Sequence, residues 1–515
     1  MSEITKRKLV PEDLYQFVTV GDPQISPDGE MIAFVRTTID KESKEPRSSL
    51  WMVPAAGGTP VQFTRGPKSD STPRWSPDGR QIAFVSDRGG DRQIWLIDRY
   101  GGEARQLTTM KNGAGNPVWS PNGRQIAFTS MVGKDEDRSL LAHPKAEADK
   151  KADEKKAKDE ARVFTRMGWR SNSVGILPEK KNQVWVIDVP AAEQPASAPI
   201  QVTWGEYDHG NPNWSPDGKF LAFGAKRTDD ESLRFFDVWF VAVPGADSAA
   251  ARATTAHSAQ EPTGDERKAA AEDCAAAAKQ AEAEFAPTCL SKQRGMFFDA
   301  TFSPDGRTVA ALGHQNEYEN ATQSSIWLFP VDGGEPRTLD NWDLAIGDTV
   351  GADVRNGGGI DLTWAPDGNV IYVSVSERGA CVVYGFPVAG GKPYIQAGGQ
   401  REIYGGSFDA NCELFAFVAG DIHHIGDLYL LDTREYTETK LTDVNGKLWA
   451  ELELSEVEEV NFKARDGWDV HGWLLKPVGF EPGKKYPLVL DVHGGPHTCF
   501  GYAFYQEFHV LAAAG

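Results

Sequence analysis

The chain has 515 residues, of which 40% are hydrophobic and 25% are charged, and its formal net charge at pH 7 is −20. This length exceeds that of a typical domain with a single hydrophobic core, so we expect at least two domains. The acidic balance argues against nucleic acid as a partner, because phosphate groups are bound by basic surfaces. No apolar run reaches the length of a membrane-spanning helix, and the first residues lack the apolar core of a secretory signal. We therefore expect no membrane partner and take a cytoplasmic location as the default.

The cysteines predict neither a metal site nor a disulfide framework. There are five of them, an odd number, and none has metal-ligand spacing: Cys274, Cys289, Cys381, Cys412 and Cys499. Reduced thiols are the expectation for so few cysteines. Cys274 and Cys289 fall in one segment, so the sequence leaves open whether these two pair. No motif in the chain points to a metal or another cofactor.

A repeated turn organises most of the chain. Its copies are Ser26–Gly29, Ser76–Gly79, Ser215–Gly218 and Ser303–Gly306 with the sequence Ser-Pro-Asp-Gly, the variants Ser120–Gly123 and Ala365–Gly368, and a degenerate seventh copy at Ser407–Ala410. Proline presets φ at the second turn position, Asp or Asn suits the third, and glycine takes the left-handed conformation that ends the turn. Each copy is therefore expected to join two strands.

Strand patterns follow the turns at regular positions. The turn at Ser76–Gly79 is followed by Ile82–Val85 and then by Ile94–Ile97, and both runs are rich in β-branched and aromatic residues. Self-similar units of this kind, with three or four short strands each, are the signature of a β-propeller. Seven copies predict seven blades. A β-sandwich with accidental turns would not place seven turns in register with their flanking strands.

Two insertions lengthen the repeat, near 134–162 and 246–295. The first is rich in Lys, Glu, Asp and Ala with nearly balanced charge, which predicts a solvated helix or loop. Within the second, Ala269–Glu284 is expected to form an exposed helix. Arg166 and Arg170 follow the first insertion. They are either surface cations on a blade strand or groups that bind a substrate carboxylate, with which a guanidinium pairs well.

The repeat ends near residue 450, and a different pattern follows. Val460–Leu475 reads as a hairpin around an Asp-Gly turn. The apolar run Leu488–Val492 predicts one buried strand of a parallel sheet. His493, Gly494, Gly495 and Pro496 then break this strand before a segment with helical spacing. A buried strand needs neighbours for its backbone groups, so these residues begin a sheet and do not complete it.

The order of these motifs resembles the prolyl oligopeptidase family of serine peptidases, and most closely its acylaminoacyl-peptidase and dipeptidyl-peptidase-like bacterial branch. The stretches that carry the resemblance are Pro11–Tyr15, the seven turns, Gln183–Val186, Arg465–Pro477 and Tyr486–His497. The resemblance implies a mainly β fold, a seven-bladed β-propeller followed by the incomplete start of an α/β-hydrolase domain. The implied boundaries are 1–20 for an N-terminal segment, 21–450 for the propeller and 451–515 for the truncated hydrolase part.

The family resemblance also implies a reaction. Members hydrolyse short peptides through an acyl-enzyme, and the propeller restricts access to the active site. The loop His493–Pro496 would then be the oxyanion loop, with the backbone N–H of Gly495 forming half of the oxyanion hole. Read without the resemblance, the same four residues are a tight turn with no chemistry.

The catalytic triad is missing from this sequence. No Gly-x-Ser-x-Gly elbow occurs, and the nearest string, Gly405–Phe408, reads as a degenerate blade turn. The family places Ser, Asp and His after the oxyanion loop, hence beyond Gly515. We therefore expect residues 1–515 to be inactive alone and to need the missing C-terminal hydrolase segment as a partner, in addition to short peptide substrates.

Two other functions fit the same residues. A propeller of this type also serves as a non-catalytic binding module, and the same scaffold carries esterases. The sequence downstream of Gly515 distinguishes a peptidase from a non-catalytic binding module. A comparison of ester and peptide substrates distinguishes a peptidase from an esterase. Exopeptidase or endopeptidase specificity, residue preference and the oligomeric state, a homo-oligomer included, are left open by the sequence.

Overall fold

The computed structural model describes most of the chain. The described residues are 6–134, 136, 141, 164, 168–171, 175–177, 179–191, 194–228, 235–245, 248, 276–292, 295–318, 321–355, 358–495 and 498–515. They divide into two compact units: described residues up to Pro73 with 318–325 and 339–515 in the first, and 74–317 with 326–338 in the second. Within the described ranges, no helix has the length and apolarity needed to cross a membrane.

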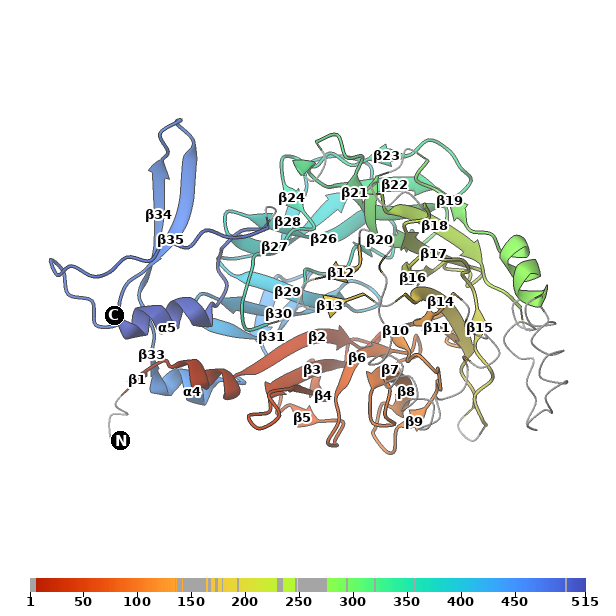
Figure 1. The fold of residues 1–515 in the computed structure, drawn as a ribbon, viewed down its shortest axis with the longest axis horizontal. Coiled ribbons are helices and arrows are strands. Elements are labelled where there is room, and N and C mark those ends of the chain that lie inside the picture. Colours follow the sequence, from red (N-terminus) through yellow and green to blue (C-terminus); the bar gives the residue numbers. More distant parts are fainter. Residues whose placement is uncertain are drawn as a thin grey trace. The chain divides into compact units, whose positions relative to one another are not determined.

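The described residues are mainly strands, and these form seven antiparallel blades in chain order (Figure 1). Blades 1 to 5 are separate four-stranded sheets, whereas blades 6 and 7 belong to one nine-stranded sheet, because a single parallel bridge between Cys381 and Glu402 joins them. Blade 1 contains β2 (Val18–Ile25), β3 (Met31–Ile39), β4 (Pro46–Pro54) and β5 (Val61–Gln62). Blade 2 contains β6 (Asp70–Trp75), β7 (Gln81–Ser86), β8 (Gln93–Asp98) and β9 (Arg105–Gln106). Blade 3 contains β10 (Gly115–Trp119), β11 (Gln125–Val132), β14 (Lys181–Asp188) and β15 (Ile200–Gln201).

The remaining blades follow the same plan. Blade 4 contains β16 (His209–Trp214), β17 (Phe220–Ala225), β18 (Asp237–Ala242) and β19 (Thr288–Cys289). Blade 5 contains β20 (Met296–Phe302), β21 (Thr308–His314), β22 (Ser325–Pro330) and β23 (Arg337–Thr338). Blade 6 has a first strand in two pieces, β24 (Ala345–Ile346) and β25 (Thr363–Trp364), then β26 (Val370–Glu377), β27 (Ala380–Pro387) and β28 (Tyr394–Ala397). Blade 7 contains β29 (Glu402–Phe408), β30 (Leu414–Asp421), β31 (His424–Asp432) and β32 (Thr437–Lys440).

The repeated turn works as its sequence predicts. In blade 2 the Ser76 hydroxyl donates to Asp78 at 2.6 Å and accepts the backbone N–H of Gln81 at 2.9 Å. Gly79 closes the turn with a φ of +68°, in the left-handed region that favours glycine. The turn thus joins β6 to β7 and fixes their register.

The seventh, degenerate copy was predicted two residues too early, at Ser407–Ala410. Ser407 and Phe408 belong to strand β29, and the turn is Asp409–Cys412, closed by a hydrogen bond from the Cys412 N–H to the Asp409 carbonyl at 3.1 Å. Cys412 takes the left-handed conformation in place of glycine, with a φ of +54°. The Asp409 carboxylate accepts the backbone N–H of Leu414 at 2.8 Å, which is the serine's part in the other turns. Ser407 lies on β29, where its hydroxyl accepts the backbone N–H of Ile25 in blade 1. Its hydrogen bond therefore joins two blades, as expected of a structural serine.

Blades 7 and 1 pack directly on each other within the first unit. Phe34 and Ile32 of blade 1 share one apolar cluster with Ala416, Val418 and Leu428 of blade 7. All of these side chains are almost fully buried. Each of the two blades is built from contiguous residues, so side-chain packing joins them without a shared strand.

The N-terminal segment packs with the residues that follow blade 7. β1 (Arg7–Lys8) pairs in parallel with β33 (Leu452–Glu453), next to helix α4 (Gly446–Glu451). The 3-10 helix η1 (Pro11–Tyr15) and helix α5 (Gln506–Ala514) lie in the same region. The apolar cluster that holds it together contains Leu9, Phe17, Ile425, Leu448, Leu452 and Phe504.

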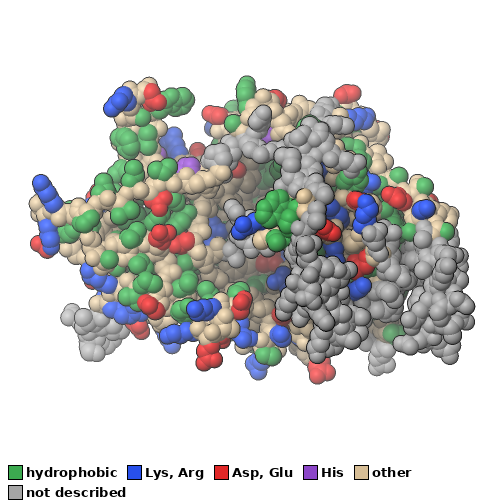
Figure 2. All heavy atoms as spheres, in the orientation of Figure 1, with side chains coloured by type: hydrophobic (Ala, Val, Ile, Leu, Met, Phe, Trp, Pro, Cys, Tyr) green, Lys and Arg blue, Asp and Glu red, His purple; other side chains and the backbone are tan. Residues whose placement is uncertain are grey.

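The C-terminal residues confirm one expectation and contradict another. β34 (Val457–Lys463) and β35 (Asp469–Leu475) form the expected hairpin. The strand expected at Leu488–Val492 is wrong for this structure: the run has no regular secondary structure, and Leu488 and Leu490 are 81% and 83% exposed. No described strand pairs with the run, so within the described residues no sheet satisfies its backbone or covers its side chains. Figure 2 shows hydrophobic side chains on the hairpin and over the neighbouring surface at the left of the view.

The insertions lie largely outside the described residues. Of the first, residues 134, 136 and 141 are described. In the second, residues 276–284 are helical, but the helix is not simply exposed, because Ala278 and Ala281 are buried against Trp204. Cys274 is outside the described residues, so pairing with Cys289 stays untested.

Candidate active-site loop

The loop that follows the apolar run exposes its backbone. His493, Gly494 and Gly495 are all exposed, and Pro496 lies outside the described residues. Gly495 has a φ of +134°, which favours glycine. A Cβ added to Gly494 would meet no atom within 4 Å. Among the described residues, the backbone N–H groups of Gly494 and Gly495 donate no hydrogen bond. Within the described part of the chain, the loop therefore presents two backbone donors that have no partner.

An aromatic cluster ties this loop to helix α5. The His493 ring meets Phe500 edge-on at 6.0 Å, and Phe500 in turn packs edge-on against Tyr505 and Phe508, each at 5.2 Å. Tyr505 and Phe508 stack at 4.7 Å. Burial raises the pKa of Tyr505 to about 12, so this phenol stays neutral. The ring of His493 thus contacts an aromatic cluster that carries no charge.

The start of helix α5 is capped by a residue from far back in the chain. The two carboxylate oxygens of Asp353 accept the backbone N–H groups of Gln506 and Glu507, each at 2.9 Å. The local N-cap residue, Tyr505, makes no such bond. The first N–H groups of a helix have no partner inside the helix, and an anion there also interacts favourably with the helix dipole. Asp353 therefore fixes the helix to the segment that precedes β25.

A close backbone approach fixes the residues between the loop and the helix. The backbone N–H of Tyr502 donates to the carbonyl of Gly379 at 2.7 Å, and Gly351 N–H donates to the carbonyl of Cys499 at 3.0 Å. A Cβ on Gly501 would collide with the Gly379 carbonyl. Glycine at position 501 lets the segment lie directly on the turn between β26 and β27 of blade 6.

A buried ion pair holds the segment that carries Asp353. The guanidinium of Arg355 pairs with the carboxylate of Glu402, with 3.0 Å between Nε and Oε2, and the two side chains are 5% and 2% exposed. The guanidinium also lies 4.2 Å over the ring of Tyr404. Burial lowers the pKa of Arg355. Removing either charge would leave the other buried and unpaired, which is strongly unfavourable.

The two arginines predicted to bind substrate do not join this loop in one unit. Arg170 begins the short strand β12 (Arg170–Ser171), which pairs with β13 (Gly175–Ile176), and it is exposed. It belongs to the second unit, whereas the loop belongs to the first. Arg166 lies outside the described residues. A role for either arginine stays a prediction.

The anchors of the loop were missed by reasoning from sequence. Asp353 and Gln506 are 153 positions apart, and no motif surrounds either residue. Glycines at 379 and 501 are two among 52 in the chain. The nearest signal was Gly501 itself, which interrupts an aromatic stretch without a turn motif.

The fold and the loop together define a class of protein, a β-propeller that carries the beginning of a hydrolase domain. The family model for the TolB beta propeller domain matches residues 7–151. The uncharacterized peptidase YuxL of Bacillus subtilis is 30% identical over 518 residues, which cover 99% of this chain and 70% of the relative. The chain belongs to the prolyl oligopeptidase family.

More distant proteins are similar to this chain over part of their own length. The acylaminoacyl peptidase of Pyrococcus horikoshii superposes with a TM-score of 0.67 at 19% identity, over 99% of this chain and 65% of that one. Dipeptidyl-peptidase 5 of Aspergillus fumigatus is 22% identical over 293 residues, which cover 55% of this chain and 34% of the relative. The chain thus spans less than two thirds of these two proteins. The expected fold class, mainly β with a seven-bladed propeller before a hydrolase part, is confirmed.

Proposed function

We propose that the whole protein is a serine peptidase that cleaves short peptides through an acyl-enzyme, and that the exposed loop donates to the oxyanion. The observation that carries this proposal is the pair of unused N–H groups at Gly494 and Gly495 in an exposed, glycine-rich turn. Such donors stabilise the charge that develops on the carbonyl oxygen of a substrate. The peptidase names of the relatives support the reaction class.

In the proposed mechanism, a serine hydroxyl attacks the scissile carbonyl and passes its proton to a histidine. The tetrahedral intermediate places its negative oxygen against the N–H of Gly495 and a second N–H next to the nucleophile. Protonation by the histidine releases the amine, and water then hydrolyses the acyl-enzyme. The nucleophile, the aspartate and the histidine are proposed to lie beyond Gly515, so residues 1–515 alone would carry out none of these steps.

The propeller is proposed to limit access to short peptides, and Arg166 and Arg170 to bind a substrate carboxylate. A guanidinium recognises a carboxylate with two parallel hydrogen bonds. Peptides with a free C-terminus would therefore bind better than their amides. An esterase on the same scaffold would instead cleave acyl esters and leave peptide bonds intact.

The test compares two proteins. One is residues 1–515, and the other continues through the sequence that follows Gly515, to about the length of the B. subtilis relative. Both are incubated with a fluorophosphonate probe, acylaminoacyl and dipeptidyl chromogenic amides, and matched esters. We expect labelling and amide hydrolysis only in the extended protein. A burst of product from residues 1–515 would contradict the proposed position of the triad. An extended protein that is neither labelled nor active on amides would contradict the peptidase proposal.

A further inference from the structure

A pocket lies where blade 7 meets blade 1 in the first unit, and it shares no residue with the loop at 493–495. Its volume is about 690 Å³, and its walls include Phe34 and Arg36 of β3, Trp51 of β4, Lys440 of β32 and Asp443. Cavities of 300–1,000 Å³ are typical of small-molecule sites in proteins, so this one is large enough for an organic ligand of roughly that class.

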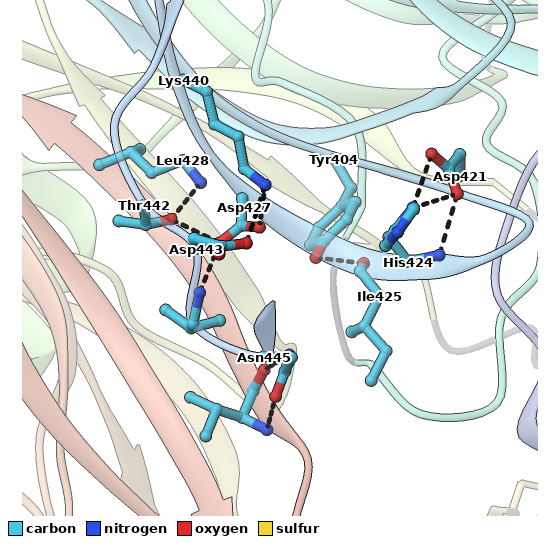
Figure 3. Close-up of polar contacts among 12 residues, drawn as sticks. Tyr404, Asp421, His424, Ile425, Asp427, Leu428, Lys440, Thr442, Asp443 and Asn445 are labelled. Atoms are coloured by element: carbon cyan, nitrogen blue, oxygen red, sulfur yellow. Dashed lines mark hydrogen bonds and ion pairs between the residues drawn. The ribbon is translucent and has the colours of Figure 1, made fainter. Parts of the chain in front are cut away.

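The two cations of this pocket differ in how their charge is balanced. Lys440 lies 3.0 Å from a carboxylate oxygen of Asp427 and 3.1 Å from one of Asp443, so two anions surround it (Figure 3). The guanidinium of Arg36 forms neither a hydrogen bond nor an ion pair with any described residue; it lies 4.6 Å over the ring of Trp51. Partial burial lowers the pKa of Arg36. An anion stabilises a partly buried guanidinium, and no described residue supplies one to Arg36.

Apolar side chains lie beside this guanidinium. Phe34 is 1% exposed, Leu441 is 7% exposed, and Trp51 is partly buried with its ring beneath Arg36. An anion alone would use only Arg36. Because Phe34 and Leu441 are already buried, the apolar surface that a ligand could still cover belongs to the partly buried Trp51, Pro60 and Val444. The pocket therefore suits a ligand that has both an anionic group and an apolar group.

We propose that this pocket binds a small monocarboxylate that carries an apolar group, such as the free C-terminus of a hydrophobic amino acid or short apolar peptide. The carboxylate would form two parallel hydrogen bonds with the Arg36 guanidinium, and the apolar group would lie against Trp51, Pro60 and Val444. A guanidinium matches a carboxylate in geometry. A phosphate dianion fits less well, because Asp427 and Asp443 place two further negative charges in or beside the pocket.

The test uses residues 1–515 and two probes that differ in one group, N-acetyl-phenylalanine and its amide. Isothermal titration calorimetry should show the acid binding about tenfold or more tightly than the amide, since a charge-assisted pair is lost. Equal binding of acid and amide to the wild-type chain would overturn the proposal without any variant. Inorganic phosphate is the third probe, and tighter binding of phosphate than of the acid would overturn the assignment to a carboxylate.

Variants locate the site. Arg36→Gln should abolish the preference for the acid, while Arg36→Lys should keep part of it because the charge remains. The matched control is Arg434→Gln, which removes an exposed arginine of blade 7 that already pairs with Glu413 and Asp432. It should bind both probes as the wild type does. Circular dichroism and thermal melting verify folding of each variant. A folded Arg36→Gln chain that retains the acid preference would overturn the proposal.

Discussion

Asn445 holds Val18 as a neighbouring strand would. Its side-chain oxygen accepts the backbone N–H of Val18 at 2.9 Å, and its side-chain nitrogen donates to the Val18 carbonyl at 2.7 Å (Figure 3). Asn445 follows the last strand of blade 7 and Val18 opens the first strand of blade 1, 427 positions earlier. The pair therefore supplies backbone-like hydrogen bonds at a junction where no strand is shared.

Asn445→Ala should destabilise the first unit. Asn445 is 4% exposed, so the substitution leaves a buried N–H and a buried carbonyl without partners, at a cost of about 1–3 kcal/mol for each. We expect the midpoint of urea unfolding, followed by circular dichroism, to fall. Asn369→Ala is the control, because it removes one side-chain hydrogen bond, from Asn369 to Asp367, within an exposed turn. Equal midpoints for the two variants would contradict the role assigned to Asn445.

Asp353→Ala should loosen helix α5 without unfolding the blades. Loss of a cap that serves two backbone N–H groups costs about 1–2 kcal/mol, part of it from the helix dipole. Hydrogen exchange of the α5 amides should therefore accelerate, whereas exchange in β29–β31 should not. Asp353→Asn keeps one acceptor and should have a smaller effect.

Asp340→Ala is the matched control for the cap. It removes an aspartate that accepts the backbone N–H of Trp342 in an exposed turn of the same unit. Exchange in α5 should be unchanged by this variant. If Asp353→Ala and Asp340→Ala gave the same exchange profile, the cap would not be what holds the helix.

The repeated turns made the propeller predictable, because the residues of each turn form hydrogen bonds with partners no more than five positions away in the sequence. The joints between distant segments were not predictable. Nothing in the sequence near Val18 or Asp353 indicates a partner hundreds of positions away. The failure at Leu488–Val492 has a different cause: hydrophobicity predicts burial only where neighbouring strands supply a surface, and no described strand does so here. Of the candidate site, the sequence pattern located the glycine-rich turn, whose role as an oxyanion loop stays a prediction, and it did not indicate the contacts that anchor this turn.

Stability should fall as the pH is lowered from about 6.5 to about 4, in part because of His509. This side chain is buried on the first unit, and its Nε2–H donates to the carbonyl of Ile422 at 2.8 Å. Burial lowers its pKa to about 4, and the ring of His423 lies 5.8 Å away. In the unfolded chain His509 takes up a proton near pH 6.5, whereas in the folded chain it stays neutral until about pH 4. Between pH 6.5 and pH 4, His509 therefore lowers the free energy of unfolding by about 1.4 kcal/mol for each unit by which the pH falls.

His509→Gln tests this pH dependence. Glutamine keeps a nitrogen donor for the Ile422 carbonyl and does not titrate, so the slope of unfolding free energy against pH between 6.5 and 4 should become shallower. A remaining slope is expected from His209, which burial also keeps neutral by lowering its pKa to about 3. His493→Gln, at an exposed histidine of the same C-terminal segment, is the matched control substitution. An unaltered slope in His509→Gln would show that this histidine does not titrate differently in the two states.

Gly495→Ala should separate folding from catalysis. The φ of +134° at Gly495 is one that a residue with a Cβ rarely adopts, so alanine would turn the N–H away from its present direction. Because the loop is exposed, the unfolding midpoint of residues 1–515 should barely change. In the extended protein, loss of one oxyanion donor should lower kcat by about 10²–10³-fold with little change in KM.

Gly494→Ala is the control, since its φ is not positive and its Cβ would enter open space, so it should retain most of the activity. If both alanine variants kept the wild-type kcat, the loop would not be an oxyanion donor, and the serine-peptidase proposal would lose the observation on which it rests.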